Sequence, residues 1–128
     1  MRPHSRAGFT LIELLIVVVI IGILAAIAVP KFGTTKGKAY SATLKSDLRN
    51  LATAQEAYYY DNATYAANLS DLNIIPSTGV TMNIAEATPA GWSATATHTQ
   101  STPTTCAVFF GAAAAVAPAT AEGRVTCQ

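Results

Sequence analysis

One carboxylate stands alone in the most apolar part of the chain. Residues 9–29 form a run of 21 residues in which Glu13 is the only charged side chain. An acidic side chain in the middle of a membrane-spanning helix costs roughly 2.5–3.5 kcal/mol on insertion scales. An ionisable group kept in such a place usually has a function and a partner. The chemistry expected of Glu13 is therefore the pairing of its charge with a cation.

The two cysteines are the second candidate for chemistry. Cys106 and Cys127 are separated by 20 residues near the C-terminus, and His98 is the only other metal-ligand type within reach. A metal site would want more ligands at closer spacing. We therefore expect a disulfide, which contributes about 3 kcal/mol in the chain-entropy account and indicates an oxidising compartment such as a periplasm.

The remaining residues do not point to an enzyme. The chain contains no Ser/His/Asp, Cys/His or phosphate-loop arrangement, and His4 and His98 are isolated. We expect no catalytic residues, no metal and no cofactor. The net charge of +1 comes without a basic tract, which argues against electrostatic capture of nucleic acid. Four neighbouring tyrosines are expected to serve packing: Tyr58, Tyr59, Tyr60 and Tyr65.

The apolar run is long enough to cross a bilayer as a helix, since about 20 apolar residues suffice. A polar leader at residues 1–8, MRPHSRAG, precedes it. An ordinary signal peptide is cut after its apolar stretch at a small-residue site, and Val29-Pro30-Lys31 does not provide one. Cutting at Gly8 would leave the helix on the mature protein. A plain single-helix anchor is the alternative, and the charges on either side of the run do not decide its orientation.

These residues resemble the N-terminus of a type IV prepilin. The likeness is carried by G8-FTLIELLIVVVIIGILAAIAVP-K31 and by the plan of leader, apolar helix, amphipathic helix and small domain with a late cysteine pair. It implies that a prepilin peptidase cuts between Gly8 and Phe9 and N-methylates the Phe9 amine. It also implies that the protein waits in the inner membrane until the pilus assembly machinery draws it into a helical filament. Glu13 would then face the Phe9 amine of its own or a neighbouring subunit.

Helix geometry agrees with this role for Glu13. Residues four apart share one face of a helix, so Glu13 and Phe9 are neighbours there. A buried charge without its partner is strongly destabilising, and the pair would therefore act as a register device between subunits.

Gly22 and Pro30 weaken the same helix, by about 1 and 3 kcal/mol relative to alanine. In the family, the segment between the corresponding glycine and proline can lose helical order in the filament. A simple kink at Pro30 is the other interpretation.

The rest of the chain predicts an α+β fold. Residues 30–61 are expected to continue the helix with an amphipathic half, and Gly33 and Gly37 suggest a flexible joint at residues 30–38. Residues 62–79 are expected to connect, with a short turn at 70–72. Residues 80–128 are expected to form three or four antiparallel strands, at 80–84, 92–97, 106–110 and 124–127. The helical stripe that would pack on this sheet is Leu44, Leu48, Leu51, Gln55 and Tyr58, with Asp47 off it.

We therefore expect a structural subunit of a type IV pilus that serves adhesion, twitching motility or DNA uptake. The precursor would cross the bacterial inner membrane once, with its C-terminal domain in the periplasm, and would end in an extracellular pilus. A surface or DNA ligand is not identified. The alternatives are a minor pilin, a type II secretion pseudopilin, or a tethered binding domain that never polymerises. Pseudopilins tend to use calcium in a C-terminal loop, and Glu122 is the only carboxylate side chain in residues 111–128.

Overall fold

The computed structural model of the protein describes residues 8–128, so residues 1–7 of the predicted leader lie outside the described residues. The chain divides into two compact units, one ending at Gly33 and the other running from Thr34 to Gln128. The elements follow one another as helix α1 (Leu11–Asn62), the short 3-10 helix η1 (Leu69–Leu72) and strands β1 (Val80–Thr88), β2 (Gly91–His98), β3 (Thr105–Gly111) and β4 (Thr126–Cys127).

Helix α1 contributes to both units. Its first part is a nearly uninterrupted series of Leu, Ile, Val and Ala, and it remains helical through Gly22 and Pro30. The flexible joint expected at residues 30–38 is helical in the structure, although the boundary between the two units falls there. Gly37 is buried because the β2–β3 loop lies against it: the Thr102 backbone N–H donates to the Gly37 carbonyl at 3.3 Å.

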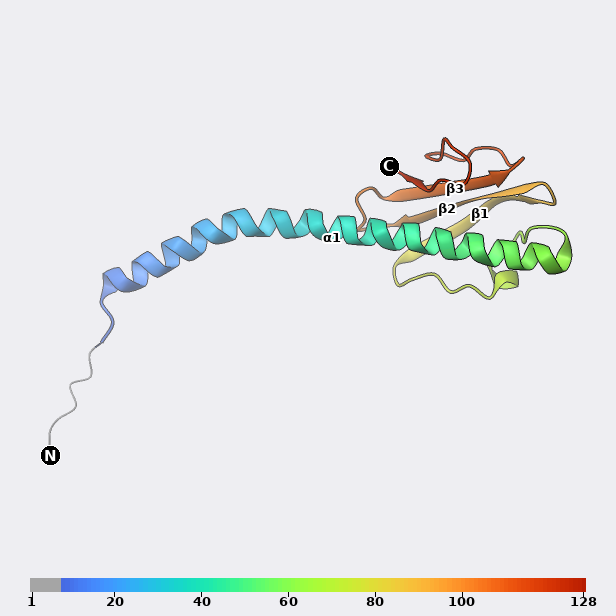
Figure 1. Ribbon diagram of the computed structural model, residues 1–128. Helices are drawn as coiled ribbons and strands as arrows, with labels where there is room; N and C mark the ends of the chain where they lie inside the picture. Colours follow the sequence, from blue (N-terminus) through green and yellow to red (C-terminus); the bar gives the residue numbers. More distant parts are fainter. Residues whose placement is uncertain (1–7) are drawn as a thin grey trace, which may run out of the picture. The chain divides into compact units, whose positions relative to one another are not determined.

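The four strands form one antiparallel sheet in the order β1-β2-β3-β4. Figure 1 shows the three long strands side by side, with the later part of α1 running along them. The side chains of β2 that face α1 are paired with those of β3, so that Trp92 lies opposite Phe110 and Ala94 opposite Val108. Trp92 is completely buried at the centre of this core. The predicted α+β fold is confirmed.

The face of α1 that packs on the sheet is the predicted stripe. Leu44, Leu48, Leu51 and Gln55 are fully buried, and Tyr58 at its end is half-buried. Asp47, which we expected off the stripe, is only 6% exposed. It lies three residues after Leu44 and four before Leu51, which in a helix places it on the edge of the same face. Its two carboxylate oxygens each accept a hydrogen bond from Ser77, one from N–H and one from the hydroxyl, both at 2.8 Å.

A second polar side chain of α1 anchors the connection to the sheet. The Gln55 amide donates to the Ala66 carbonyl and accepts from the Ala66 N–H, both at 2.8 Å. The pair satisfies a buried backbone position that no strand or helix would otherwise satisfy. The helix ends at Asn62, as expected, and the predicted turn at 70–72 is η1.

The final strand is shorter than predicted. We expected residues 124–127, but β4 contains only Thr126 and Cys127. Gly123 has a φ of +70°, and the Arg124 N–H donates back to Ala121, so the chain is still turning at that point. The C-terminal segment, residues 112–125, is instead held by carboxylates. Glu122 accepts from the Gly111 N–H at 2.7 Å, and Glu86 of β1 accepts from the Ala114 N–H at 2.9 Å.

Candidate assembly site

The N-terminus of α1 is closed by Thr10 and Glu13. The Glu13 carboxylate accepts from the Thr10 backbone N–H at 2.7 Å and from the Thr10 hydroxyl at 2.8 Å. The Thr10 hydroxyl in turn lies 3.3 Å from the Glu13 backbone N–H, which donates to it. This reciprocal arrangement is a capping box, in which the residue before the helix and the residue three positions later satisfy each other's backbone donors. The single acidic side chain of the apolar run therefore has partners within one subunit.

The capping box changes the expectation for Glu13. The partner predicted from the sequence is Phe9, and Thr10 is an additional one. Thr10-Leu11-Ile12-Glu13 matches the Ser/Thr-x-x-Glu signature that precedes an apolar helix. While the Gly8–Phe9 peptide bond is intact, the Phe9 nitrogen is an amide and carries no charge. Phe9 itself lies before the helix and is 90% exposed. Its pairing with Glu13 remains a prediction for the processed chain.

The first part of α1 exposes its apolar side chains on all sides. Leu11 is 81% exposed and Ile20 51%, and none of the most apolar 18-residue window of the helix is buried. This window has a mean hydropathy of 3.2, which by length and composition is enough to cross a membrane. Soluble monomers rarely expose contiguous apolar surface of this kind, so it requires lipid or other apolar helices as cover. Gly22 and Pro30 both lie within this continuous helix.

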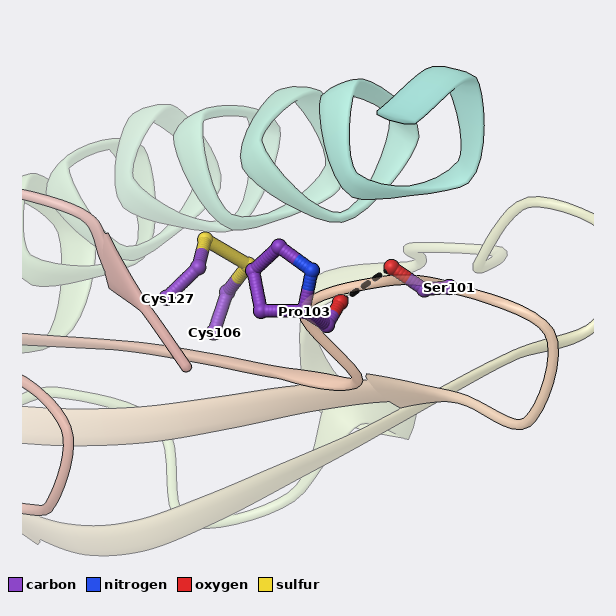
Figure 2. The surroundings of a disulfide bond; sticks show 4 residues. All are labelled: Ser101, Pro103, Cys106 and Cys127. Carbon is purple, nitrogen blue, oxygen red and sulfur yellow. Dashed lines mark hydrogen bonds between the residues drawn. A yellow bond between two sulfur atoms is a disulfide. The ribbon is translucent and has the colours of Figure 1, made fainter. Parts of the chain in front are cut away.

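The predicted disulfide is present. Cys106 of β3 and Cys127 of β4 are direct partners in the antiparallel register, and their sulfur atoms are bonded. Figure 2 shows the disulfide together with the β2–β3 loop, in which the Ser101 hydroxyl donates to the Pro103 carbonyl. The bond fastens the last strand to the sheet, which two residues of pairing would hold only weakly.

Carboxylates near the C-terminus are already used as hydrogen-bond acceptors. Glu86 accepts from the Ala114 N–H of the C-terminal segment, and Glu122 of that segment accepts from the Gly111 N–H at the end of β3. Within residues 8–128, no three side chains of the His, Cys, Asp and Glu types gather in a way that would hold a metal ion.

Comparison with known proteins places the N-terminal segment in a defined group. Residues 3–29 match the family described as the prokaryotic N-terminal methylation motif. The chain is 41% identical over 78 residues to the type IV major pilin protein PilA of Myxococcus xanthus, which covers 61% of this chain and 35% of that protein. It is 39% identical over 69 residues to the type IV wide pilus major component PilA4 of Thermus thermophilus, covering 54% of this chain and 53% of the relative.

A type II secretion protein is similar to about the same degree. The type II secretion system core protein G of Pseudomonas aeruginosa is 37% identical over 75 residues, which covers 59% of this chain and 53% of the relative. The chain thus spans between about a third and about half of the length of these relatives. The likeness to type IV pilins inferred from the sequence is confirmed, and pseudopilins share it.

Proposed function

The chain carries the N-terminal segment of type IV pilins and pseudopilins, and we propose that it is the structural subunit of a type IV pilus. The observation that carries the proposal is the exposed apolar part of α1. It begins with the capping box of Thr10 and Glu13, and it lies within the match to the methylation motif. Such a surface is stable only in lipid or against other helices, which are the two environments of a pilin before and after assembly. The protein has no enzymatic role in this proposal.

Processing is the first step of the proposal. A prepilin peptidase cuts between Gly8 and Phe9 and methylates the new Phe9 amine, while the apolar helix holds the precursor in the inner membrane. The unit that contains the sheet lies on the periplasmic side of the membrane, which agrees with its disulfide. Cleavage turns a neutral amide next to the capping box into a cation.

That new charge suits the geometry at the start of α1. In the precursor, Glu13 is satisfied by Thr10 alone, so membrane residence does not require a second subunit. A carboxylate retains lone pairs beyond the two that Thr10 uses, and a cationic amine is the stronger partner. The Phe9 amine of a neighbouring subunit can therefore join Glu13 without breaking the cap, which would set the register of helices in the filament. We propose that the segment between Gly22 and Pro30 loses helical order during assembly.

The test uses the full chain produced together with a pilus assembly machinery. Sheared surface filaments are expected to contain this protein, beginning at N-methylated Phe9 by mass spectrometry. The Glu13→Ala variant is expected to be cleaved and membrane-inserted but to lose at least tenfold in filament yield. Asn83→Ala, an exposed change on strand β1 in the other unit, is the matched control and should assemble normally. Purified filaments that begin at Met1 would overturn the proposal.

A pseudopilin of type II secretion is the second candidate, because the core protein G relatives match as well as the pilins do. Two observations favour a pilin. The C-terminal segment is fastened by a disulfide, and its carboxylate Glu122 accepts a backbone hydrogen bond. A pseudopilin should stay with the cell after shearing and should support secretion of a folded enzyme, whereas a minor pilin should be a small fraction of the sheared material. A tethered domain would remain a monomer in membranes.

A further inference from the structure

A groove with a basic rim runs along one side of α1 in the unit that contains the sheet. Its volume is about 390 Å³. Helix α1 contributes Lys45, Leu48, Arg49 and Ala52, strand β3 contributes Val108 and Phe110, and the C-terminal segment closes it with residues 122–125. The floor is apolar, because Leu48 and Val108 belong to the buried core beneath it. The groove exists because β4 is too short to continue along β3 at this point.

The charges on this groove are predominantly positive. Lys45, Arg49 and Arg124 line it, and all three are exposed. The one carboxylate among the lining residues, Glu122, accepts a hydrogen bond from the Gly111 N–H at 2.7 Å. Lys36 and Lys38 are the only other basic residues in residues 34–128. More than half of the cations of this unit therefore gather at one groove.

A second hollow of opposite charge lies on another side of the same helix. It has a volume of about 280 Å³ and is lined by Ala54, Ala57, Tyr58, Asp61 and Asn62 of α1 and by Asp71, Leu72 and Asn73 at η1. Asp61 and Asp71 are exposed, and Asp71 accepts a hydrogen bond from the Asn68 amide at 3.3 Å. No basic side chain lines this hollow. The basic groove has three cations and one carboxylate, and the two carboxylates of this hollow equal its excess positive charge in number.

Helix geometry places these two sites on opposite flanks of α1. At 100° per residue, the sixteen residues from Lys45 to Asp61 correspond to a rotation of roughly 160°. The buried stripe lies between the flanks on one side. On the other side α1 presents exposed residues that have small or short side chains as far as residue 57, followed by the exposed Tyr60; the small or short ones are Ala42, Ser46, Asn50, Thr53 and Ala57. Small side chains allow another helix to approach closely, because interaxial distances of 8–10 Å depend on the residues at the contact.

We propose that the basic residues that line the groove of one copy of this chain contact the acidic residues that line the hollow of the next copy in the assembled filament. The proposal rests on the proposed function, since it describes a contact between filament subunits. A contact between two different surfaces is heterologous, and repeated without closure it produces an open helical filament. One flank of α1 thus meets the opposite flank of α1 in the neighbouring copy. In each copy, the side of α1 with small residues lies between its two flanks.

The positions of the two sites also predict the offset between copies. Lys45 and Arg49 lie sixteen and twelve residues before Asp61 on α1, which corresponds to about 18–24 Å along the helix axis. Two copies with parallel helices must therefore be displaced along the axis by about this distance for the charges to meet. The acidic site is the nearer to the C-terminus of α1, so the copy that offers it lies displaced toward the N-terminal end of its neighbour's helix.

A polyanion is the competing occupant of the groove. Binding to nucleic acid normally shows as a basic stripe and a strongly basic domain, whereas this chain has a net charge of +1 and a carboxylate within the groove. A second copy requires only two carboxylates next to an apolar hollow, and the acidic site provides both. The groove is therefore assigned to a neighbouring subunit.

The test reverses each site separately in the full chain, produced with a pilus assembly machinery. One variant carries Lys45→Glu and Arg124→Glu, and the other carries Asp61→Lys and Asp71→Lys. Each alone places like charges on both flanks and is expected to reduce sheared filaments at least tenfold. The two variants produced together, or all four changes in one chain, are expected to restore the yield to within threefold of the wild type. Lys36→Glu with Lys38→Glu is the control for net charge and should assemble normally.

Several outcomes would overturn the inference. If either reversed variant forms filaments at the wild-type level, or if the combined reversal fails to restore filaments while each chain keeps its disulfide and its thermal midpoint, the two sites do not meet. If the Lys45→Glu and Arg124→Glu variant assembles normally but its filaments lose binding to double-stranded DNA, the groove belongs to a polyanion. An absence of filaments from the wild-type chain would instead refute the proposed function, and the inference with it.

Discussion

Leu15 and Leu48 are the same residue type in the same helix, yet Leu15 is 54% exposed and Leu48 is fully buried. Between Gly8 and Gly33 no apolar side chain is buried, whereas residues 34–128 cover their apolar helix face with a sheet. Hydrophobic burial stabilises a fold only where a partner surface exists. The apolar surface of the first unit is therefore available to another molecule or to lipid, whereas the apolar surface of the second unit is buried within its own fold.

The sharpest test of this contrast is a pair of identical substitutions. Leu48→Ala should lower the free energy of unfolding of the sheet-containing unit by about 2–5 kcal/mol, because it leaves a cavity in the core. Leu15→Ala should leave that unfolding unchanged, since its side chain is 54% exposed and does not belong to the core of that unit. Thermal unfolding of the full chain in detergent, followed through the near-ultraviolet signal of Trp92, measures both. Equal losses from the two changes would show that the two units unfold as one.

The disulfide should have the next largest effect. Replacing both cysteines with serine should destabilise the sheet-containing unit by about 3 kcal/mol. The helical signal of residues up to Gly33 should not change, because the bond lies wholly in the other unit. Chemical unfolding with and without a reducing agent measures the difference in the wild type. An unchanged midpoint after complete reduction would mean that the pairing of β4 does not depend on the bond.

The capping box gives a smaller effect confined to the first unit. Thr10→Ala should cost the start of α1 about 1 kcal/mol, because the Glu13 N–H loses its acceptor. Hydrogen exchange in micelles should then show roughly fivefold faster exchange at the Glu13 amide, which is that cost expressed as a rate ratio. Exchange at the buried Leu51 amide should be unaffected. If the Glu13 amide exchanges at its original rate, the cap does not form in the membrane environment.

The smallest effect concerns alkaline pH and belongs to the second unit. Burial raises the pKa of the Tyr65 hydroxyl, and the negative charge of Glu56, which accepts its hydrogen bond at 3.2 Å, raises that pKa further. The folded state therefore keeps the tyrosine proton at a pH where the unfolded chain has lost it. Its contribution is complete below the ordinary tyrosine pKa of about 10 and disappears as the pH rises through the raised value. Urea midpoints of the Tyr65→Phe variant should accordingly fall less steeply above pH 10 than those of the wild type.

Much of this molecule was predictable from the sequence because periodicity reports burial directly. Leucines at steps of four and three predicted the stripe on α1, and alternation in β2 predicted Trp92 in the core. The same reasoning missed Asp47, because a polar residue was assumed to point outward. Its burial depends on Ser77, thirty residues away, and no local pattern reports such a partner.

At the candidate site, the partner predicted for Glu13 is the Phe9 amine, whereas in the structure Glu13 accepts hydrogen bonds from Thr10. Thr10 lies three residues before Glu13, which is the spacing of a capping box, but the prediction sought a cation for the Glu13 carboxylate and a hydroxyl carries no charge. The basic groove lay beyond sequence reasoning for another reason. Lys45 and Arg49 are near Arg124 only because α1, β3 and the C-terminal segment meet there.

The two glutamates that hold the C-terminal segment bind main-chain N–H groups. Glu86 accepts from the Ala114 N–H of the segment, and Glu122, which belongs to the segment, accepts from the Gly111 N–H of β3. Of the side chains of residues 112–125, these two hydrogen bonds use only that of Glu122. Five of the fourteen residues of the segment are exposed alanines, at Ala112, Ala114, Ala115, Ala117 and Ala121. Substitutions at these alanines therefore leave both hydrogen bonds in place. New side chains there can change the surface that the segment presents, while the two hydrogen bonds that fix its path stay the same.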